Sequence, residues 1–148
     1  MTDLLDDKKF AAKLKREKRG ASELDVANQC DAMAVTMGWH VERYDQRRAS
    51  GIHKGLPDRR YTKDTIRCRV WIDHKAPAEK MSREQARWME VELQSGGHAA
   101  PIDSVESLVA LLRIFNGSST GDSWARTRCT ELYKLCVARG FRAEKKPR

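Results

Sequence analysis

Apolar residues recur every three or four positions along several stretches of the chain, which is the spacing of one helix face. In other stretches apolar and polar residues alternate, which is the spacing of a half-buried strand. The pattern predicts helices over 22–39, 81–97, 103–117 and 123–140. It predicts strands over 39–45, 59–63, 65–75 and 98–102. This order of elements is typical of an α/β fold with a small mixed β-sheet flanked by helices.

The ends of two predicted helices carry capping signals. Ser22 is followed three residues later by Asp25, and Ser82 is followed three residues later by Gln85. A hydroxyl and a polar side chain at this spacing satisfy two backbone N–H groups reciprocally, as in a capping box. Gly38 is the residue expected after the last turn of the first helix.

The strand predicted over 65–75 has two different faces. Ile66, Cys68, Val70 and Ile72 share one face, which we expect to pack in the core. The other face is polar, because alternation places Asp73 and Lys75 there side by side. Its members are Arg67, Arg69, Trp71, Asp73 and Lys75.

The chain divides by composition into a core and two basic ends. Residues 1–20 run from acidic to strongly basic and are expected to be an appendage, either a solvated segment or an arm on a phosphate backbone. Residues 21–116 hold most of the predicted elements. Residues 117–148 are expected to be a linker, a last helix and a basic tail.

The overall charge favours a polyanionic partner. Lys and Arg number 29 against 21 Asp and Glu, a net charge of +8 in 148 residues. Such a balance suits nucleic acid, because neutralising phosphates releases counterions. No apolar run is long enough to cross a membrane and no secretory signal is present, so we expect a cytoplasmic protein with no membrane partner.

The cysteines and tryptophans are interpreted as structural. Cys30, Cys68, Cys129 and Cys136 form no zinc-like spacing and fit small buried hydrophobes in a reducing compartment. The tryptophans are more often core or rim residues than platforms for stacking bases. They are Trp39, Trp71, Trp88 and Trp124.

Asp58, Asp73 and Lys75 together meet the requirements of metal-dependent phosphodiester hydrolysis. Mg²⁺ and Mn²⁺ prefer carboxylate and carbonyl oxygens, and the bound metal activates water. A lysine beside the carboxylates can orient that water or stabilise the charge that develops on the phosphate. The backbone carbonyl of His74 lies between Asp73 and Lys75 in sequence and is a further candidate oxygen ligand.

These residues form a PD-(D/E)xK pattern, and their surroundings resemble the virus-type replication-repair nuclease (VRR-NUC) family of that superfamily. The resemblance covers about two-thirds of the chain, from Ser22 to about Phe115. The motifs that carry it are Ser22-Glu23, Gly38-Trp39, Gly55-Leu56-Pro57-Asp58, Asp73-His74-Lys75, Ser82-Arg83-Glu84-Gln85-Ala86-Arg87-Trp88 and Gly96-Gly97.

The resemblance implies a PD-(D/E)xK nuclease core and a Mg²⁺- or Mn²⁺-dependent endonuclease acting on DNA. Glu23 would complete the metal site with Asp58 and Asp73, Lys75 would be the catalytic lysine, and Gln85 would lie near the site. Small relatives resemble junction-cutting dimers from phages or mobile elements, which implies a homodimer, branched DNA or nicking, and a bacterial or phage-infected cell. Basic residues expected to hold the phosphate backbone are Arg43, Arg47, Arg48, Lys54, Arg59 and Arg60.

Two departures from the family pattern keep other interpretations open. Asp73 stands where the family usually has glutamate, and Arg59-Arg60 stand where apolar strand residues are expected. A nuclease fold with weakened chemistry that binds DNA or a partner protein is therefore the alternative, and an RNA-binding structural protein is a third.

Taken singly, each motif also has a plain structural explanation. Pro57-Asp58 is ordinary turn chemistry. Asp73 and Lys75 would form an ion pair of little energetic value at a surface. Glu23 would be a carboxylate favoured by the helix dipole, and Gln85 a capping residue.

Overall fold

The computed structural model describes residues 22–44, 55–117 and 121–143. The predicted N-terminal appendage at 1–20, residues 144–148 of the predicted basic tail, and Arg47, Arg48 and Lys54 lie outside these residues. In chain order the elements are α2 (Glu23–Thr36), β1 (His40–Arg43), β2 (Arg59–Lys63), the 3₁₀ helix η2 (Asp64–Ile66), β3 (Cys68–His74), α3 (Arg83–Gln94), β4 (Ala99–Ile102), α4 (Val105–Asn116) and α5 (Gly121–Val137).

The strands form one mixed sheet in the order β1-β2-β3-β4. The pairs β1–β2 and β2–β3 are antiparallel, and β4 runs parallel to β3. The parallel pair is joined through α3, which supplies the crossover that parallel strands require. The predicted α/β class with a small mixed sheet is confirmed.

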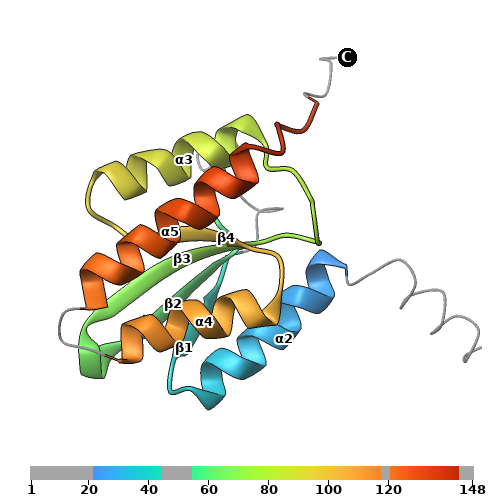
Figure 1. The fold of residues 1–148 in the computed structure, drawn as a ribbon. Coiled ribbons are helices and arrows are strands. Elements are labelled where there is room, and N and C mark those ends of the chain that lie inside the picture. Colours follow the sequence, from blue (N-terminus) through green and yellow to red (C-terminus); the bar gives the residue numbers. More distant parts are fainter. Residues whose placement is uncertain (1–21, 45–54, 118–120, 144–148) are drawn as a thin grey trace, which may run out of the picture.

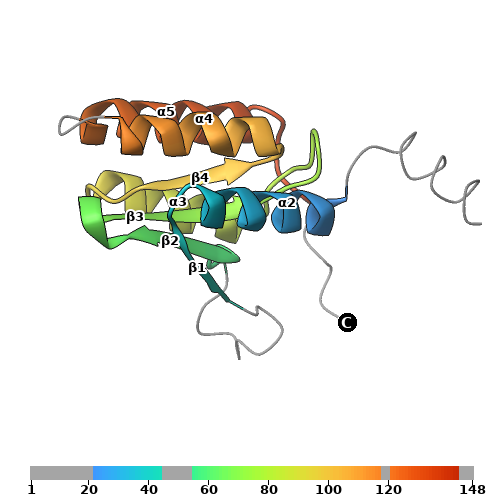
Figure 2. The ribbon, with the colours of Figure 1, turned by 90° about the horizontal axis from the view of Figure 1, so that it is seen from below.

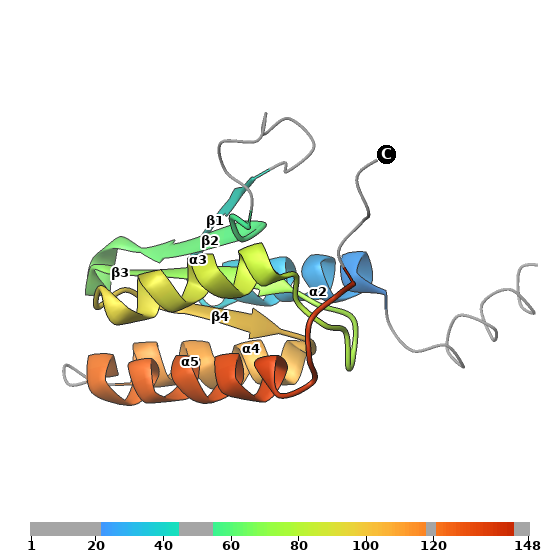
Figure 3. The same ribbon diagram turned by 90° about the horizontal axis from the view of Figure 1, so that it is seen from above.

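The helices cover two faces and one edge of this sheet (Figure 1). Helices α2 and α3 lie on opposite sides of the strands, and α4 and α5 run side by side along the β4 edge (Figures 2 and 3). Contacts between α5 and β4, and between α4 and both α2 and α5, hold this arrangement. The two faces of β3 therefore meet different helices.

The capping signals read from the sequence are confirmed. Ser22 with Asp25, and Ser82 with Gln85, each form both hydrogen bonds of a capping box. Gly38 follows α2 with a φ of +90°, a conformation that glycine adopts without steric cost. Both caps matter for the site, because Glu23 and Gln85 lie in the two helix turns that they organise.

The start of β3 differs from the prediction. The ladder between β2 and β3 ends at the pair Lys63 and Cys68, so the chain must reverse within residues 64–67. A 3₁₀ turn and Arg67, with a φ of 52°, make this reversal. The expectation that Ile66 belongs to the buried strand face was therefore wrong, and Ile66 is 36% exposed.

The last helix packs into the same core as the sheet. Ala125, Cys129 and Cys136 of α5 are buried in the central apolar cluster. The cysteines are free, and burial raises the pKa of Cys129 to about 12, which fits the interpretation as unreactive hydrophobes. None of the helices in the described part of the chain has the length and apolar character needed to cross a membrane.

Candidate active site

The predicted catalytic residues come from β3, from α3 and from the residues just after β3 and just before β2, which meet on one side of the sheet. Asp73 is near the end of β3, and Lys75 is just beyond it. Gln85 lies in the first turn of α3, which covers this face. The side chains of Asp73 and Lys75 are only 2% and 1% exposed, so the expectation of a surface ion pair is wrong.

Lys75 links the strand to the helix. Its Nζ lies 3.1 Å from Oδ2 of Asp73 and donates a hydrogen bond of 2.9 Å to Oε1 of Gln85. The same oxygen of Gln85 accepts from the backbone N–H of Ser82 at 3.0 Å. The capping glutamine therefore also holds the ammonium group of Lys75, and its catalytic role stays a prediction.

The glycine of the Gly55-Leu56-Pro57-Asp58 motif lies against this same helix turn. Gly55 has a φ of +89°, and a Cβ on it would lie 2.3 Å from the backbone oxygen of Glu84. Only glycine permits this approach without moving either segment. The motif thus seats the start of β2 on the turn of α3 that carries Gln85.

Asp58 stands immediately before β2, one residue past the end of the β2–β3 ladder. Its Oδ1 accepts a hydrogen bond of 3.1 Å from the backbone N–H of His74, and its Oδ2 lies 3.2 Å from Nδ1 of the same residue. The guanidinium of Arg59 lies 3.6 Å from Oδ2. Because Arg59 pairs with Ile72, one further step of the register sets Asp58 opposite Asp73.

Glu23 approaches the site from the first residue of α2. Burial, together with a hydrogen bond to Glu79 and its negative charge, raises the pKa of Glu23 to about 7. The charge of Lys75 lowers the pKa of Glu23 and the charge of Asp73 raises it. Glu23 is therefore close enough to interact electrostatically with both site residues. Glu79 is a carboxylate that the sequence did not single out, and its Oε2 accepts from the N–H of Ala76 at 2.7 Å.

Asp73 carries a charge that its surroundings only partly compensate. Burial raises the pKa of Asp73 to about 6, although the charge of Lys75 acts in the opposite direction. The negative charge of Asp58 adds to the increase. Oδ2 of Asp73 is buried and meets the Lys75 ammonium at 3.1 Å, in a contact that is not a well-directed hydrogen bond. An incompletely satisfied buried carboxylate beside a second carboxylate is a frequent property of functional sites.

The opposite face of the same two strands holds a second polar network, which the sequence did not predict. The Tyr61 hydroxyl donates to Oδ1 of Asp31 at 2.8 Å and lies 3.1 Å from Nε2 of His74. Nε of Arg59 donates to both Asp31 oxygens, at 3.2 and 3.1 Å. The arginine in place of an apolar strand residue was the one signal of this network, since a buried guanidinium needs a carboxylate partner.

The described basic residues predicted to bind phosphate differ in whether their guanidinium groups are accessible. Arg59 is 9% exposed and its guanidinium is bound inside the protein, so it is not presented to a phosphate. Arg43 is accessible, with a side chain 66% exposed, and contacts Asp31 at 3.4 Å. Arg60 is paired with Glu42 at 2.7 Å and remains 25% exposed.

The donor chemistry around Asp73 suits a hard divalent cation, since every candidate ligand is an oxygen. The buried Oδ2 of Asp73 is the atom that such an ion would satisfy. As arranged, each carboxylate is engaged by protein groups, and no three His, Cys, Asp or Glu side chains among the described residues are grouped to hold a metal ion. Metal binding at Glu23, Asp58, Asp73 and the His74 carbonyl therefore remains a prediction.

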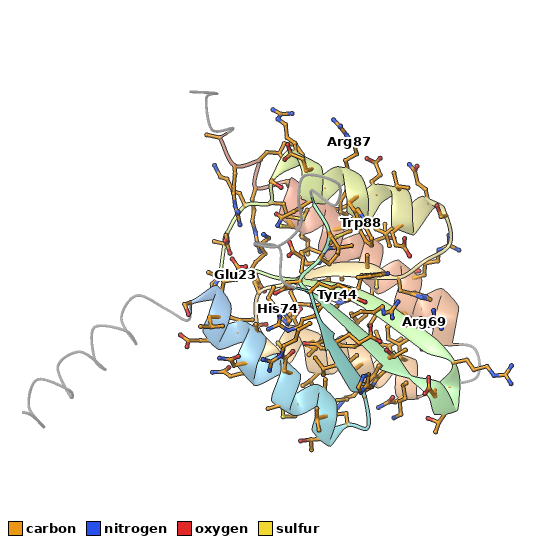
Figure 4. The ribbon with its side chains drawn as sticks, turned by 180° about the vertical axis from the view of Figure 1, so that it is seen from behind. Glu23, Tyr44, Arg69, His74, Arg87 and Trp88 are labelled. Carbon is orange, nitrogen blue, oxygen red and sulfur yellow. The ribbon has the colours of Figure 1, made fainter. Side chains whose placement is uncertain are left out.

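Figure 4 shows how these elements lie relative to one another. Glu23 and His74 lie toward one end of the sheet, and Arg69 lies toward the other.

A scan against protein-family models, a search of curated proteins and a search of solved structures each found no match to this chain.

Proposed function

We propose that this protein is a Mg²⁺- or Mn²⁺-dependent DNA endonuclease whose site is formed by Asp58, Asp73, Lys75 and Gln85, with Glu23 at its border. The observation that carries the proposal is the buried Asp73–Lys75 pair. Both side chains are almost fully withdrawn from water, yet Oδ2 of Asp73 lacks a well-directed hydrogen bond. The positions of Gly55 and Gln85 add support, since both join the motif segments to one helix turn.

The residues have distinct roles in this proposal. Asp58 and Asp73, with Glu23 and the His74 carbonyl, would hold the metal, which lowers the pKa of an attacking water and neutralises phosphate charge. Lys75 is oriented by Gln85 and would stabilise the charge that develops on the phosphate in the transition state. Burial of the ammonium strengthens that interaction, because the local dielectric is low.

Incubation with supercoiled, nicked and branched DNA in Mn²⁺, Mg²⁺ or EDTA tests the activity. We expect metal-dependent cleavage that falls about 10²- to 10³-fold in Lys75→Met, the loss typical of removing one group that stabilises transition-state charge. Asp58→Asn is expected to abolish the metal dependence together with the activity.

Lys134→Ala is the matched control, because Lys134 is exposed on α5. It removes one positive charge without touching the proposed site, so its cleavage rate should equal that of the original protein. Absence of metal-dependent cleavage of every substrate, or full activity in Lys75→Met and Asp58→Asn, would refute the assignment.

The second candidate is a nuclease-like fold that binds DNA without cutting it. The specific observation in its favour is that Asp58 is held by His74 and Arg59, and Glu23 by Glu79, rather than being turned toward a shared ion. This candidate predicts salt-dependent DNA binding, no cleavage in any metal, and affinity unchanged by Asp58→Asn. The two candidates are therefore separated by the same set of variants.

A further inference from the structure

Three aromatic residues from separate elements meet on the face of the sheet that carries Asp73. The ring centroid of Trp71 on β3 lies 5.3 Å from that of Tyr44 and 5.1 Å from that of Trp88 on α3. None of the three is fully buried. In Figure 4, Tyr44 and Trp88 lie between Arg69 and the end of the sheet near Glu23 and His74.

Trp71 is the central member and supports the outer two. Its contact with Trp88 is edge-on, with an interplanar angle of 70°, and its contact with Tyr44 is tilted at 43°. Trp71 and Trp88 also pack against the apolar core, and both outer residues stay partly exposed, so part of each outer ring is available to a ligand. Val91, one turn along α3 from Trp88, is 58% exposed, so the apolar surface extends along the helix.

Positive charge accompanies the aromatic residues on this face. The guanidinium carbon of Arg60 lies 5.3 Å from the ring centroid of Trp71, in a cation–π contact. Arg69 is exposed and lies two residues before Trp71, so strand alternation places both on the same face. Glu42 offsets part of this charge through its pair with Arg60.

This surface is continuous with the proposed site. Trp71 and Asp73 are two residues apart on β3, so they share a face and are separated by about 7 Å along the strand. Tyr44 is bonded through its backbone N–H to the carbonyl of Asp58 at 2.9 Å. Helix α3 contributes Gln85 to the site and Trp88 to the aromatic surface, three residues apart on one helix face.

We propose that Tyr44, Trp71 and Trp88 form a binding surface for unpaired bases of a DNA strand bound beside the proposed site. Aromatic rings stack on the faces of bases, which are accessible in single strands and at branch points but covered in a continuous duplex. Arg60 and Arg69 supply the charge that a phosphate backbone requires. The inference deepens the proposed function by naming its substrate class, and it holds for binding even if cleavage fails.

The test measures binding separately from chemistry. Fluorescein-labelled oligonucleotides of one sequence, as a single strand, a fork and a blunt duplex, are titrated with Lys75→Met protein in EDTA. Tyr44→Leu and Trp88→Leu are made singly and together in that background, because leucine keeps apolar bulk and removes the stacking ring. Trp124→Leu is the matched control, since Trp124 is 71% exposed on α5, which lies along the β4 edge.

We expect single-stranded and forked DNA to bind more tightly than the duplex. The double variant should weaken the binding of both by about tenfold or more, the effect expected when base stacking is removed. Duplex binding should change little, and Trp124→Leu should bind all three substrates as the background protein does. Circular dichroism and thermal melting check that each variant is folded.

Equal binding of single strand and duplex by the background protein would overturn the proposal. So would an unchanged single-strand affinity in the folded double variant, or an equal loss in Trp124→Leu. A shift in sedimentation that follows the same substitutions, without loss of DNA binding, would identify the surface as a contact between copies instead. None of these outcomes depends on whether the protein cleaves DNA, so failure here is distinguishable from failure of the nuclease assignment.

Discussion

Strands β2 and β3 carry a buried polar cluster on each face, and the two clusters differ in how completely they are satisfied. On the α2 face, Asp31 receives hydrogen bonds from Arg59 and Tyr61, and Tyr61 reaches His74. On the α3 face, Asp73 faces Lys75, with its Oδ2 lacking a well-directed hydrogen bond.

The comparison separates a structural role from a chemical one. A closed network of complementary charges and hydrogen bonds orders the strand ends, and its groups have little left to offer a ligand. The α3 face instead holds Asp73, whose pKa is raised to about 6, and nearby Glu23 at the start of α2 has a pKa raised to about 7. Burial destabilises the ionised form of such carboxyls, and a bound cation would stabilise that form. Asp58, which contacts His74 and lies opposite Asp73, connects the two clusters.

The substitution with the largest expected effect is made in the hydrogen-bonded network around Asp31. Asp31→Ala removes the partner of Arg59 and Tyr61 and should lower the free energy of unfolding by about 3–5 kcal/mol, because a buried guanidinium is left uncompensated. Urea unfolding followed by circular dichroism measures this loss. Glu131→Ala breaks the exposed pair with Arg128 and should cost less than about 1 kcal/mol. A loss of similar size in both variants would contradict the role assigned to the network.

Lys75→Met tests the open cluster through its pH dependence. Without the ammonium the pKa of Asp73 should rise further above its unfolded value, so the folded protein holds a proton that the unfolded chain releases. Stability is then lost as pH increases, and we expect the variant to lose about 1–3 kcal/mol more at pH 8 than at pH 5. Parallel urea titrations at the two pH values measure the difference. A pH-independent loss would show that Asp73 does not titrate in response to Lys75.

Gly55→Ala tests the link between the motif loop and α3. A residue with a Cβ at a φ of +89° is strained and meets the backbone of Glu84, which should cost about 1–3 kcal/mol. The added Cβ would displace the turn of α3 that carries Gln85. The cleavage rate should therefore fall by more than the loss of folded protein explains. Gly140→Ala is the control, since its φ is +87° and a Cβ there meets nothing within 4 Å. Equal activity in the two variants would argue against this coupling.

Glu23→Gln should give the smallest effect and reports on the border of the site. The pKa of Glu23 is raised from 4.5 to about 7, so the native state loses stability as pH rises through that interval. Glu23 is partly exposed, so its contribution to the pH dependence of the unfolding free energy is reduced by solvent screening to about 1 kcal/mol. The variant should show a shallower decline in melting temperature between pH 4.5 and 7. Added Mg²⁺ should stabilise the original protein at pH 8 more than the variant, and equal stabilisation would exclude Glu23 as a ligand.

Local sequence was sufficient for the main helices and strands and for the capped helix starts. Capping boxes at Ser22 and Ser82, and the glycine after α2, depend on residues close in the chain, so spacing alone reveals them. Strand alternation likewise placed Trp71, Asp73 and Lys75 on one face, because its period of two is independent of the partner strand. The 3₁₀ turn at Asp64–Ile66 escaped prediction because the length of a hairpin reversal depends on where the ladder ends.

The sequence by itself determined which residues could share a face, and the motif spacing named Asp58, Asp73, Lys75 and Gln85 together. Only the tertiary structure decided that the Asp73–Lys75 pair is buried, since α3 covers that face. It also decided that Arg59 turns inward to Asp31, a partner 28 residues away. Burial and long-range pairing depend on which helix packs on which face, and the free energy of a charge depends on both. A one-dimensional pattern states neither, which is why the sequence left a surface ion pair open for Asp73 and Lys75 and the fold buries both.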